Sequence, residues 1–507
     1  MDTMEYVPTI GLEVHAELKT RTKMFCDSLN DPSENHPNVN VCPVCLGHPG
    51  TLPVPNKQAI EQVIKVGLAL GSKPNAKSRF DRKNYFYPDL PKAYQISQSG
   101  EPLVIGGMLR GVRVNHIHLE EDAGKLAHGE KEGGAKDREV ETRDMGQGTR
   151  DTGHGTGNRA DASLVDFNRA GVPLMELVTE PDLHTAEDAV AFMKELQLIL
   201  RYLGVSDADL ERGQMRADAN ISLSATPELG TRAEVKNLNS FSAVFAAINY
   251  EIKRQAEILE KGEKVHQETR GWDEAKQKTT SQRSKEEAQD YRYFPEPDIP
   301  PFEPVKIFDV EKLRDSLPEL PDQKRERFKK EFGLDGKQAE LLVGDPAAAN
   351  YFEEAVSELR SDERGSKTGE ALLFNYLTSD LRGLMNLNGT AFPDLKVAPE
   401  RLAHLVALLD AQKITTRQAK DLLAKMFETG GDPEEIVKSE NIGIASDADE
   451  VEAVVLSIIA ENQAAVGDYK KGKTASLQFL IGKAMGKLKG RARPDMLKDF
   501  FERNMAG

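Results

Sequence analysis

The sequence predicts an α+β protein, in which a domain built on a mostly antiparallel sheet is followed by an all-α domain and a small helical tail. Up to about residue 300, short apolar runs interrupted by Gly, Pro and Asn alternate with occasional helical patterns. Beyond that point, apolar residues recur with the period of an α-helix. A chain of 507 residues is also too long for one core, so we expect domains at residues 1–304, 305–430 and 431–507.

The first domain is expected to combine polar-faced strands with a few helices. Local alternation predicts strands at Ile10–His15, at Gln214–Ser222 and from Ala233 onward. Helical patterns cover Lys57–Leu70, Thr185–Leu203 and Ser242–Lys261. Residues 127–161 hold eight glycines and almost no large apolar side chain, which predicts a mobile surface insertion.

A proline-rich stretch separates the two halves of the chain, because proline fixes φ and removes a hydrogen-bond donor. We therefore expect a domain boundary near Pro304. Breaks at Asn462–Gly467 and Gly472 are expected to precede the helices of the tail. The helices predicted after the boundary are Lys337–Leu342, Ala347–Leu359, Glu370–Leu387, Pro399–Leu409, Thr416–Glu428, Asp449–Glu461, Ser476–Leu488 and Pro494–Asn504.

Composition indicates a soluble cytoplasmic protein. Hydrophobic residues make up 39% of the chain and charged residues 30%, and no apolar run is long enough to cross a bilayer. The first residues lack the pattern of a signal or transit peptide. Three cysteines are too few for a disulfide framework, which favours reduced thiols or a metal site.

Charge is distributed unevenly along the chain. The formal net charge is -16, yet residues 467–507 carry +6 and the remainder carries -22. Such a basic segment is typical of a phosphate-binding surface, although a solvated basic helix face remains an alternative. The candidate contacts are Lys470, Lys471, Lys473, Lys487, Lys489, Arg491 and Arg493.

Acidic residues and a histidine are expected to converge on one face of the sheet. Strand period two places Glu13 and His15 on the same side. Glu120 and Glu121, followed by Asp122, form an acidic triplet that would repel itself without a cation such as Mg²⁺. Simple hydration of these acids at a strand end is the alternative.

A second polar group has the residues of an anion pocket. Arg216 and Asp218 share one face of their strand, and Lys236 lies on the next strand. Asn239 or Ser240 could cap the helix that follows, and helix N-termini bind phosphate. Metal and cations together suit phosphoryl transfer, whereas a ladder of structural ion pairs is the competing interpretation. No Walker A sequence or Gly-rich dinucleotide fingerprint occurs.

The cysteines have the spacing of a zinc ribbon that lacks one thiolate. Cys26 is followed by Cys42 and Cys45, which supply three ligands where a structural zinc site takes four. A nearby Asp or His could complete the set, and a knuckle that folds without metal is equally compatible. The residues that could serve as the fourth ligand are Asp27, His36 and His48.

Several long motifs resemble those of the B subunits of aspartyl/glutamyl-tRNA amidotransferases, over nearly the whole chain. The resemblance rests on Ile10-Gly-Leu-Glu-Val-His15, Cys42-Pro-Val-Cys-Leu-Gly-His-Pro-Gly50, Arg82-Lys-Asn-Tyr-Phe-Tyr-Pro-Asp-Leu-Pro-Lys-Ala-Tyr-Gln-Ile-Ser-Gln98, Glu120-Glu-Asp-Ala-Gly-Lys125, Asp166-Phe-Asn-Arg-Ala-Gly-Val-Pro-Leu-Met-Glu176 and Val235-Lys-Asn-Leu-Asn-Ser-Phe241. It implies a cradle domain related to glutamine synthetase and guanido kinases, a helical domain and a tail that reaches tRNA.

The resemblance also implies the reaction and its partners. With ATP and Mg²⁺, a protein of this family would phosphorylate the side-chain carboxylate of glutamate or aspartate misacylated on tRNA. Ammonia would come from a partner amidase (glutaminase), the A subunit, with the small C subunit as the third component. An acyl phosphate has a good leaving group, so ATP use would lower the barrier to amidation.

Carried over to this chain, the resemblance assigns roles to particular residues. The catalytic residues are Glu13, His15, Glu121 and Lys236. The metal ligands are Glu13, His15, Glu120 and Glu121. ATP and the acyl phosphate are assigned to Arg216, Asp218, Lys236 and Asn237, and the predicted helix start adds Asn239 and Ser240 to this group. The substrate is assigned to Lys83, Tyr85 and Tyr87.

The chain departs from the family pattern at two places. Ser28 stands where the family often has a fourth cysteine, and the glycine-rich insertion is longer than expected. Two other functions stay open: a noncatalytic tRNA-binding scaffold that keeps the fold, and a free-standing ATP-dependent amide ligase acting on a small molecule. The basic tail makes the second of these less fitting.

Overall fold

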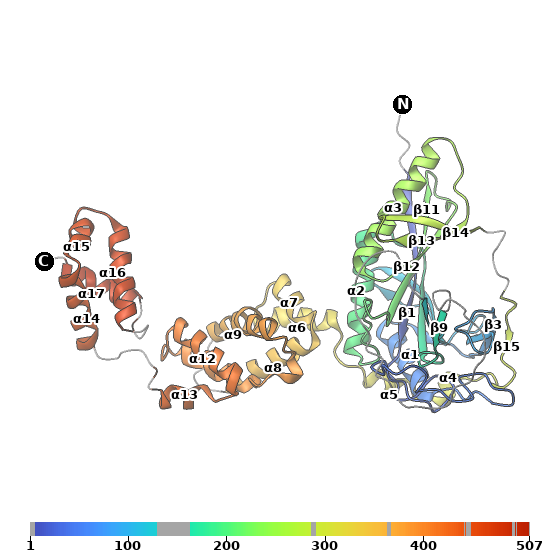
Figure 1. Ribbon diagram of the computed structural model, residues 1–507, viewed down its shortest axis with the longest axis horizontal. Helices are drawn as coiled ribbons and strands as arrows, with labels where there is room; N and C mark the ends of the chain where they lie inside the picture. Colours follow the sequence, from blue (N-terminus) through green and yellow to red (C-terminus); the bar gives the residue numbers. More distant parts are fainter. Residues whose placement is uncertain are drawn as a thin grey trace, which may run out of the picture. The chain divides into compact units, whose positions relative to one another are not determined.

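The computed structural model describes residues 6–128, 163–284, 291–361, 367–440, 442, 448–488, 492 and 494–505. The chain divides into two compact units, Met1–Pro321 and Asp322–Gly507 (Figure 1). Most of the predicted insertion at 127–161 lies outside the described residues. Ala127 and His128 are the exception, because they end strand β8.

A large sheet forms the first unit, with ten strands among the described residues. Its order is β14-β13-β12-β11-β1-β10-β7-β5-β2, and β6 pairs with β7. Neighbours are antiparallel except for β12 and β13, which run parallel. The strands are β1 (Val7–Glu17), β2 (Lys73–Pro74), β5 (Val104–Ile105), β6 (Met108–Leu109), β7 (Val112–Glu121), β10 (Pro173–Thr179), β11 (Met215–Ser224), β12 (Ala233–Leu238), β13 (Glu268–Asp273) and β14 (Lys278–Ser284).

Two smaller sheets complete the β structure of the described residues. One has the order β15-β3-β4, with β3 at Asp81–Asn84, β4 at Tyr94–Ser97 and β15 at Phe294–Pro295. The other pairs β8 (Lys125–His128) with β9 (Ser163–Asp166). The three strands predicted from alternation correspond to parts of β1, β11 and β12.

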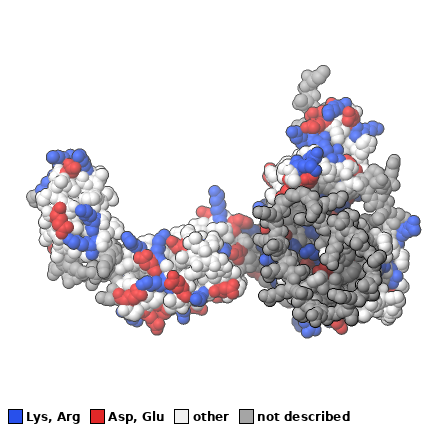
Figure 2. All heavy atoms as spheres, viewed as in Figure 1, with Lys and Arg blue, Asp and Glu red and all other residues white. Residues whose placement is uncertain are grey.

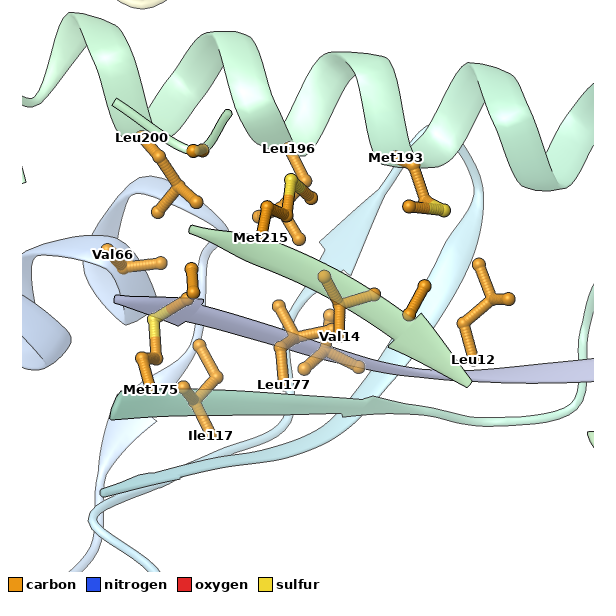
Figure 3. Packing of buried hydrophobic residues seen from close by; sticks show 14 of the residues in the cluster. Leu12, Val14, Val66, Ile117, Met175, Leu177, Met193, Leu196, Leu200 and Met215 are labelled. Atoms are coloured by element: carbon orange, nitrogen blue, oxygen red, sulfur yellow. The ribbon is translucent and has the colours of Figure 1, made fainter. Parts of the chain in front are cut away.

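One face of the large sheet is apolar and carries the core. Because side chains alternate along a strand, Leu12 and Val14 of β1 point to the same side as Leu177 of β10. Figure 3 shows these side chains meeting Met193 and Leu196 of the helix above them. Burial of this face on helices leaves the opposite face of the sheet for polar residues.

The helices of the first unit begin where capping side chains stand. Thr185 accepts a hydrogen bond from Asp188 N, and Glu187 and Asp188 lie in the first turn. Ser240 accepts from Ala243 N, so it is the N-cap that the sequence left open between Asn239 and Ser240. The helices are α1 (Lys57–Ala69), α2 (Ala186–Tyr202), α3 (Phe241–Glu260), α4 (Pro304–Ile307) and α5 (Val310–Asp315).

The second unit is helical throughout its described residues. The helices are α6 (Pro321–Phe332), α7 (Gly336–Val343), α8 (Pro346–Ser361), α9 (Lys367–Asn375), a π-helical segment (Tyr376–Leu381), α10 (Arg382–Asn388), a 3₁₀ turn (Phe392–Asp394), α11 (Pro399–Asp410), α12 (Thr416–Thr429), α13 (Pro433–Ser439), α14 (Ala448–Glu461), α15 (Gln463–Lys470), α16 (Thr474–Lys487) and α17 (Pro494–Met505). No helix in the described part of the chain is both long and apolar enough to span a membrane.

Two expectations for the helical part were wrong in detail. Residues Asn462–Gly467 were expected to interrupt the helices, but α15 begins at Gln463, because Val466 is buried against the tail's own core. The single helix expected at Glu370–Leu387 is α9, the π-helical segment and α10 in succession. The domain bounds at 304 and 430 stay predictions, and the first compact unit extends to Pro321.

Helices α14 to α17 share a core of their own. Val451 and Val455 of α14 are buried with Leu480 of α16 and Phe501 of α17. The C-terminal helices therefore form a small packed body rather than separate appendages.

Candidate functional site

Strand β1 brings together the polar side chains of the sheet, because it lies between β10 and β11 in the middle of the sheet. His15 stands opposite Glu176 on β10 and Arg216 on β11. Glu13 stands opposite Asp218 on β11. These side chains share the face away from the hydrophobic core.

One cluster forms around His15. Its Nε2 lies 3.2 Å from Glu176 Oε2 and 3.8 Å from Glu120 Oε1. His118 Nε2 also lies 3.2 Å from Glu176 Oε2. One ligand atom each from His15, Glu120 and Glu176 falls within 4.8 Å of the others, so these three could hold a metal ion.

Burial and charge set the protonation of this cluster. Burial lowers the pKa of His15, but Glu176 and Glu120 outweigh this effect and raise the pKa to about 9. The imidazole therefore carries a proton when no metal is bound. Burial raises the pKa of Glu176, but His118 and His15 bring it well below its ordinary value. Glu176 is therefore an anion held against the protonated His15.

A second cluster forms around Glu13, with Asp218 and Glu234 within the same distance limit of 4.8 Å. Burial raises the pKa of Glu13, and Glu176 and Glu234 raise it further. Lys236 Nζ lies 3.0 Å from both Asp218 Oδ2 and Glu234 Oε1. Burial and the neighbouring acids thus both oppose ionisation of Glu13.

A third group anchors Arg216. Its Nη2 donates to Asp122 Oδ2 over 3.0 Å, and Arg169 Nε lies 3.6 Å from the same oxygen. Burial and the neighbouring Asp122 raise the pKa of Glu17 to about 7, although both arginines oppose this. The contact with Asp122 holds the guanidinium of Arg216 beside the His15 cluster.

Two cavities border these clusters. One of about 310 Å³ is lined by residues of the His15 and Lys236 groups. The other, of about 480 Å³, is lined by Glu13, Asn220 and Arg232 among others. The residues that line the smaller cavity include His15, Lys83, Tyr85, Glu120, Asp122, Arg216, Asp218, Lys236 and Asn239.

Glu121 does not join the metal cluster in which the sequence placed it. Strand alternation turns it to the side of Ile117 and Leu119, where its carboxylate lies 2.5 Å from Lys92 Nζ and accepts from Ile96 N. Glu13 also separates from His15, because it groups with Asp218 and Glu234. The single cage expected from Glu13, His15, Glu120 and Glu121 is therefore two clusters, with Glu121 elsewhere.

Only some of the other predicted site residues line the smaller cavity. Lys83 and Tyr85 line the smaller cavity, while Tyr87 is 55% exposed. Burial lowers the pKa of Lys83, but Glu120, Tyr293 and Glu176 raise it above its ordinary value. Ser240 uses its hydroxyl to cap α3. The side chain of Asn237 lies outside the described residues.

The basic residues of the tail are exposed where the structure describes them. Lys470, Lys471, Lys473 and Lys487 lie on the surface, and Figure 2 shows basic and acidic side chains together on the tail. Lys473 pairs with Asp468 over 3.2 Å and Lys487 with Glu461 over 2.7 Å. The predicted contacts Lys489, Arg491 and Arg493 lie outside the described residues.

Sequence reasoning missed three members of the site. Glu176 is the lone acid in the apolar strand β10, and that isolation was an available signal. His118 stands two residues before Glu120 and was given no role. Glu234 stands two residues before Lys236 and was assigned to no cluster. Pairing across strands β10, β7 and β12 was needed to bring them together.

Family models and known proteins match this chain over almost its full length. Residues 8–307 match the family model of the GatB/GatE catalytic domain, and residues 350–505 match that of the GatB domain. The chain is 43% identical to the B subunit of the aspartyl/glutamyl-tRNA(Asn/Gln) amidotransferase of Ruminiclostridium cellulolyticum, covering 98% of this chain and 96% of that protein. Identity to the corresponding B subunit of Thermosipho melanesiensis is 44%, covering 96% and 97%.

Fold and site together define an α+β protein whose sheet carries an acidic pocket flanked by cations and whose second half is helical. The family follows from the matches. The chain belongs to the B subunits of aspartyl/glutamyl-tRNA(Asn/Gln) amidotransferases.

Proposed function

We propose that this chain uses ATP to activate the side-chain carboxylate of glutamate or aspartate misacylated on tRNA, and that it then amidates that carboxylate with ammonia. The observation that carries the proposal is the placement of two carboxylate clusters, Arg216 and Lys236 on one sheet face beside two cavities. The names of the similar proteins support the choice of substrate.

Both clusters have the donors that Mg²⁺ prefers, because five of their six members are carboxylates. His15, Glu120 and Glu176 would hold one ion, and Glu13, Asp218 and Glu234 would hold a second. Burial and the neighbouring acids raise the pKa of Glu13, and a cation bound beside it would favour its charged form. When bound, Mg²⁺ would offset negative charge on the transferring phosphoryl group.

The cavities suggest where the reactants bind. The volume of about 480 Å³ beside Glu13 lies within the range of small-molecule sites and would take the nucleotide. The smaller cavity, with Lys83 and Arg216, would take the aminoacyl end of the tRNA. The carboxylate to be activated would then meet the γ-phosphate near His15, which lines the smaller cavity.

Fixed cations would stabilise the transfer. Lys236 is held by Asp218 and Glu234, and Arg216 is held by Asp122, so neither side chain must reorganise as charge develops on the phosphoryl oxygens. The carboxylate oxygen attacks phosphorus and ADP leaves. Ammonia then attacks the acyl carbon, the C–O bond to phosphate breaks, and the amide forms.

The partners and the finer fold follow from the family and complete the proposal. A partner amidase would supply ammonia from glutamine, and a further small protein, the C subunit, would complete a heterotrimer in the cytoplasm. The antiparallel sheet would act as a cradle related to those of glutamine synthetase and guanido kinases. The basic tail would hold the tRNA.

The test is amidation by the chain purified together with its amidase and small-protein partners. Glutamine- and ATP-dependent conversion of Glu-tRNA(Gln) or Asp-tRNA(Asn) would support the proposal. Binding of tRNA without amidation, under conditions in which the amidase releases ammonia, would identify a scaffold. Amidation of a free carboxylic acid in preference to aminoacyl-tRNA would identify a free-standing ligase.

A further inference from the structure

The three cysteines gather at a site on the first unit that the proposed reaction does not use. Cys45 Sγ lies 3.8 Å from Cys42 Sγ, and the sulfurs of Cys26, Cys42 and Cys45 all fall within 4.8 Å of one another. Thiolates bound to zinc at about 2.3 Å lie roughly 3.8 Å apart. The spacing of the sulfurs would therefore suit zinc.

The fourth ligand is what the cluster lacks. Among the residues that the structure describes, no His, Asp or Glu ligand atom joins the three sulfurs. His36 is bound to Glu34 over 2.8 Å. His48 lines the same cavity as Cys26 and Cys45, but neither it nor Asp27 places a ligand atom within 4.8 Å of all three sulfurs, so the candidates that the sequence offered do not complete the site. Ser28 Oγ stands 3.9 Å from Cys45 Sγ, but a neutral hydroxyl is not among the usual zinc ligands.

A lysine already supplies positive charge at the same place. Lys23 is fully buried, and its Nζ lies 3.9 Å from Cys45 Sγ and 3.2 Å from Phe167 O. A buried ammonium group is costly without an anion close by. Burial lowers the pKa of Lys23, and the three sulfurs oppose that shift.

Cys45 is the sulfur that the neighbouring donors surround. Cys42 N donates to Cys45 Sγ over 3.1 Å, and Ser28 Oγ and Lys23 Nζ lie close to the same atom. A single thiolate with one ammonium group is electrically balanced without a metal.

Cys45 can also be reached from a cavity, although only 4% of the residue is exposed. A cavity of about 210 Å³ is lined by Cys26 and Cys45 together with Lys92 and Glu121. Thiolates, rather than thiols, are the reactive form of cysteine. A small electrophile that enters this cavity would meet the Cys45 sulfur.

We propose that the cysteine cluster of this chain binds no zinc, and that Lys23 and Cys45 instead form a buried ammonium–thiolate pair whose sulfur small electrophiles modify. Ser28 is the residue that decides between the two states, because a cysteine there would supply the fourth thiolate. The inference is independent of the reaction proposed above.

The first test compares the zinc content of the full chain with that of Ser28→Cys, both produced with added zinc. The chain itself should retain far less than one zinc per molecule after dialysis, while Ser28→Cys should retain about one. Ser28→Ala is the matched control and should stay without zinc. About one tightly held zinc in the unsubstituted chain would overturn the proposal.

The second test measures alkylation of Cys45 by iodoacetamide at neutral pH, read by peptide mass spectrometry. Cys45 should react readily in the unsubstituted chain, and a zinc-selective chelator should not change its rate. Zinc-loaded Ser28→Cys should be protected until the chelator is added. Lys23→Met should slow the reaction about tenfold if it folds, while the zinc measurement does not depend on that variant. Protection of the unsubstituted chain that the chelator relieves would overturn the proposal.

Discussion

The polar face of the sheet and the basic tail bring charge together by opposite means. On the sheet, Glu176 and Asp122 are at least nine-tenths buried, and each contacts a cationic group on another strand: Glu176 lies 3.2 Å from His15 and Asp122 lies 3.0 Å from Arg216. On the tail, Lys471 and Lys473 lie on the surface of a small helical body. One region fixes its charges by strand register and the other displays them to solvent.

The difference indicates a division of work between the two regions. Fixed, buried charges can stabilise a transition state because they need not reorganise. Exposed lysines attract a phosphate backbone in a way that depends on salt and little on exact position. We therefore expect substitutions on the sheet to lower kcat and changes in the tail to raise KM for tRNA.

The largest effect is expected from Glu176→Gln. The amide keeps the shape of the side chain but removes the anion that lies 3.2 Å from both His15 Nε2 and His118 Nε2. We expect kcat for ATP-dependent amidation to fall roughly 100- to 1,000-fold, with glutaminase activity of the complex retained. Glu311→Gln is the control, because that side chain is 79% exposed on α5. Equal activity of both variants would show that Glu176 takes no part in the reaction.

Removal of the tail should have the next largest effect. The deletion should begin at residue 442, since a cut inside the tail would expose Val451 and Val455, which pack on Phe501. We expect KM for tRNA to rise about 30-fold while kcat changes little, because several phosphate contacts are lost. The salt dependence of tRNA binding should weaken as well. An unchanged KM would show that the tail does not hold the substrate.

A smaller effect distinguishes the two neighbouring acids of β7. Glu120 shares a cluster with His15 and Glu176, whereas Glu121 is bound to Lys92. Glu120→Gln should weaken Mn²⁺ binding about tenfold, measured by electron paramagnetic resonance, and Glu121→Gln should leave it nearly unchanged. If the Glu121 variant alone loses Mn²⁺, the assignment of Glu120 to the metal cluster is wrong.

The sequence predicted the individual helices and strands better than the way in which they pair and pack. Long amphipathic helices such as α2 and α12 were placed to within one or two residues, because local periodicity and caps define them. Residues 462–467 were misjudged, because Val466 is held by tertiary packing that no local pattern reveals. The order of ten strands also depends on pairing between distant segments.

The site was predictable where one strand carries it and unpredictable where several do. Alternation along β1 placed Glu13 and His15 on one face, as the structure has them. Consecutive acids in a strand point to opposite faces, and this simple rule would have separated Glu121 from Glu120. Glu176 could not be assigned, because its partners lie on β1 and β7 and only the register joins them.

The smallest effect concerns His116, which stands on the polar face beside His118 with ring centroids 5.2 Å apart. Burial and the neighbouring His118 lower the pKa of His116 to about 4, although Glu176 opposes this. Between its ordinary value of 6.5 and about 4, the unfolded chain binds the proton more readily, so stability is lost as the pH falls through that window. Because the residue is partly exposed, we expect a loss of about 1 kcal/mol between pH 7 and pH 5 that His116→Gln removes. Urea unfolding followed by fluorescence of Trp272, the single tryptophan and a residue of the same sheet, measures it directly. An identical loss in the variant would show that groups other than His116 cause the pH dependence.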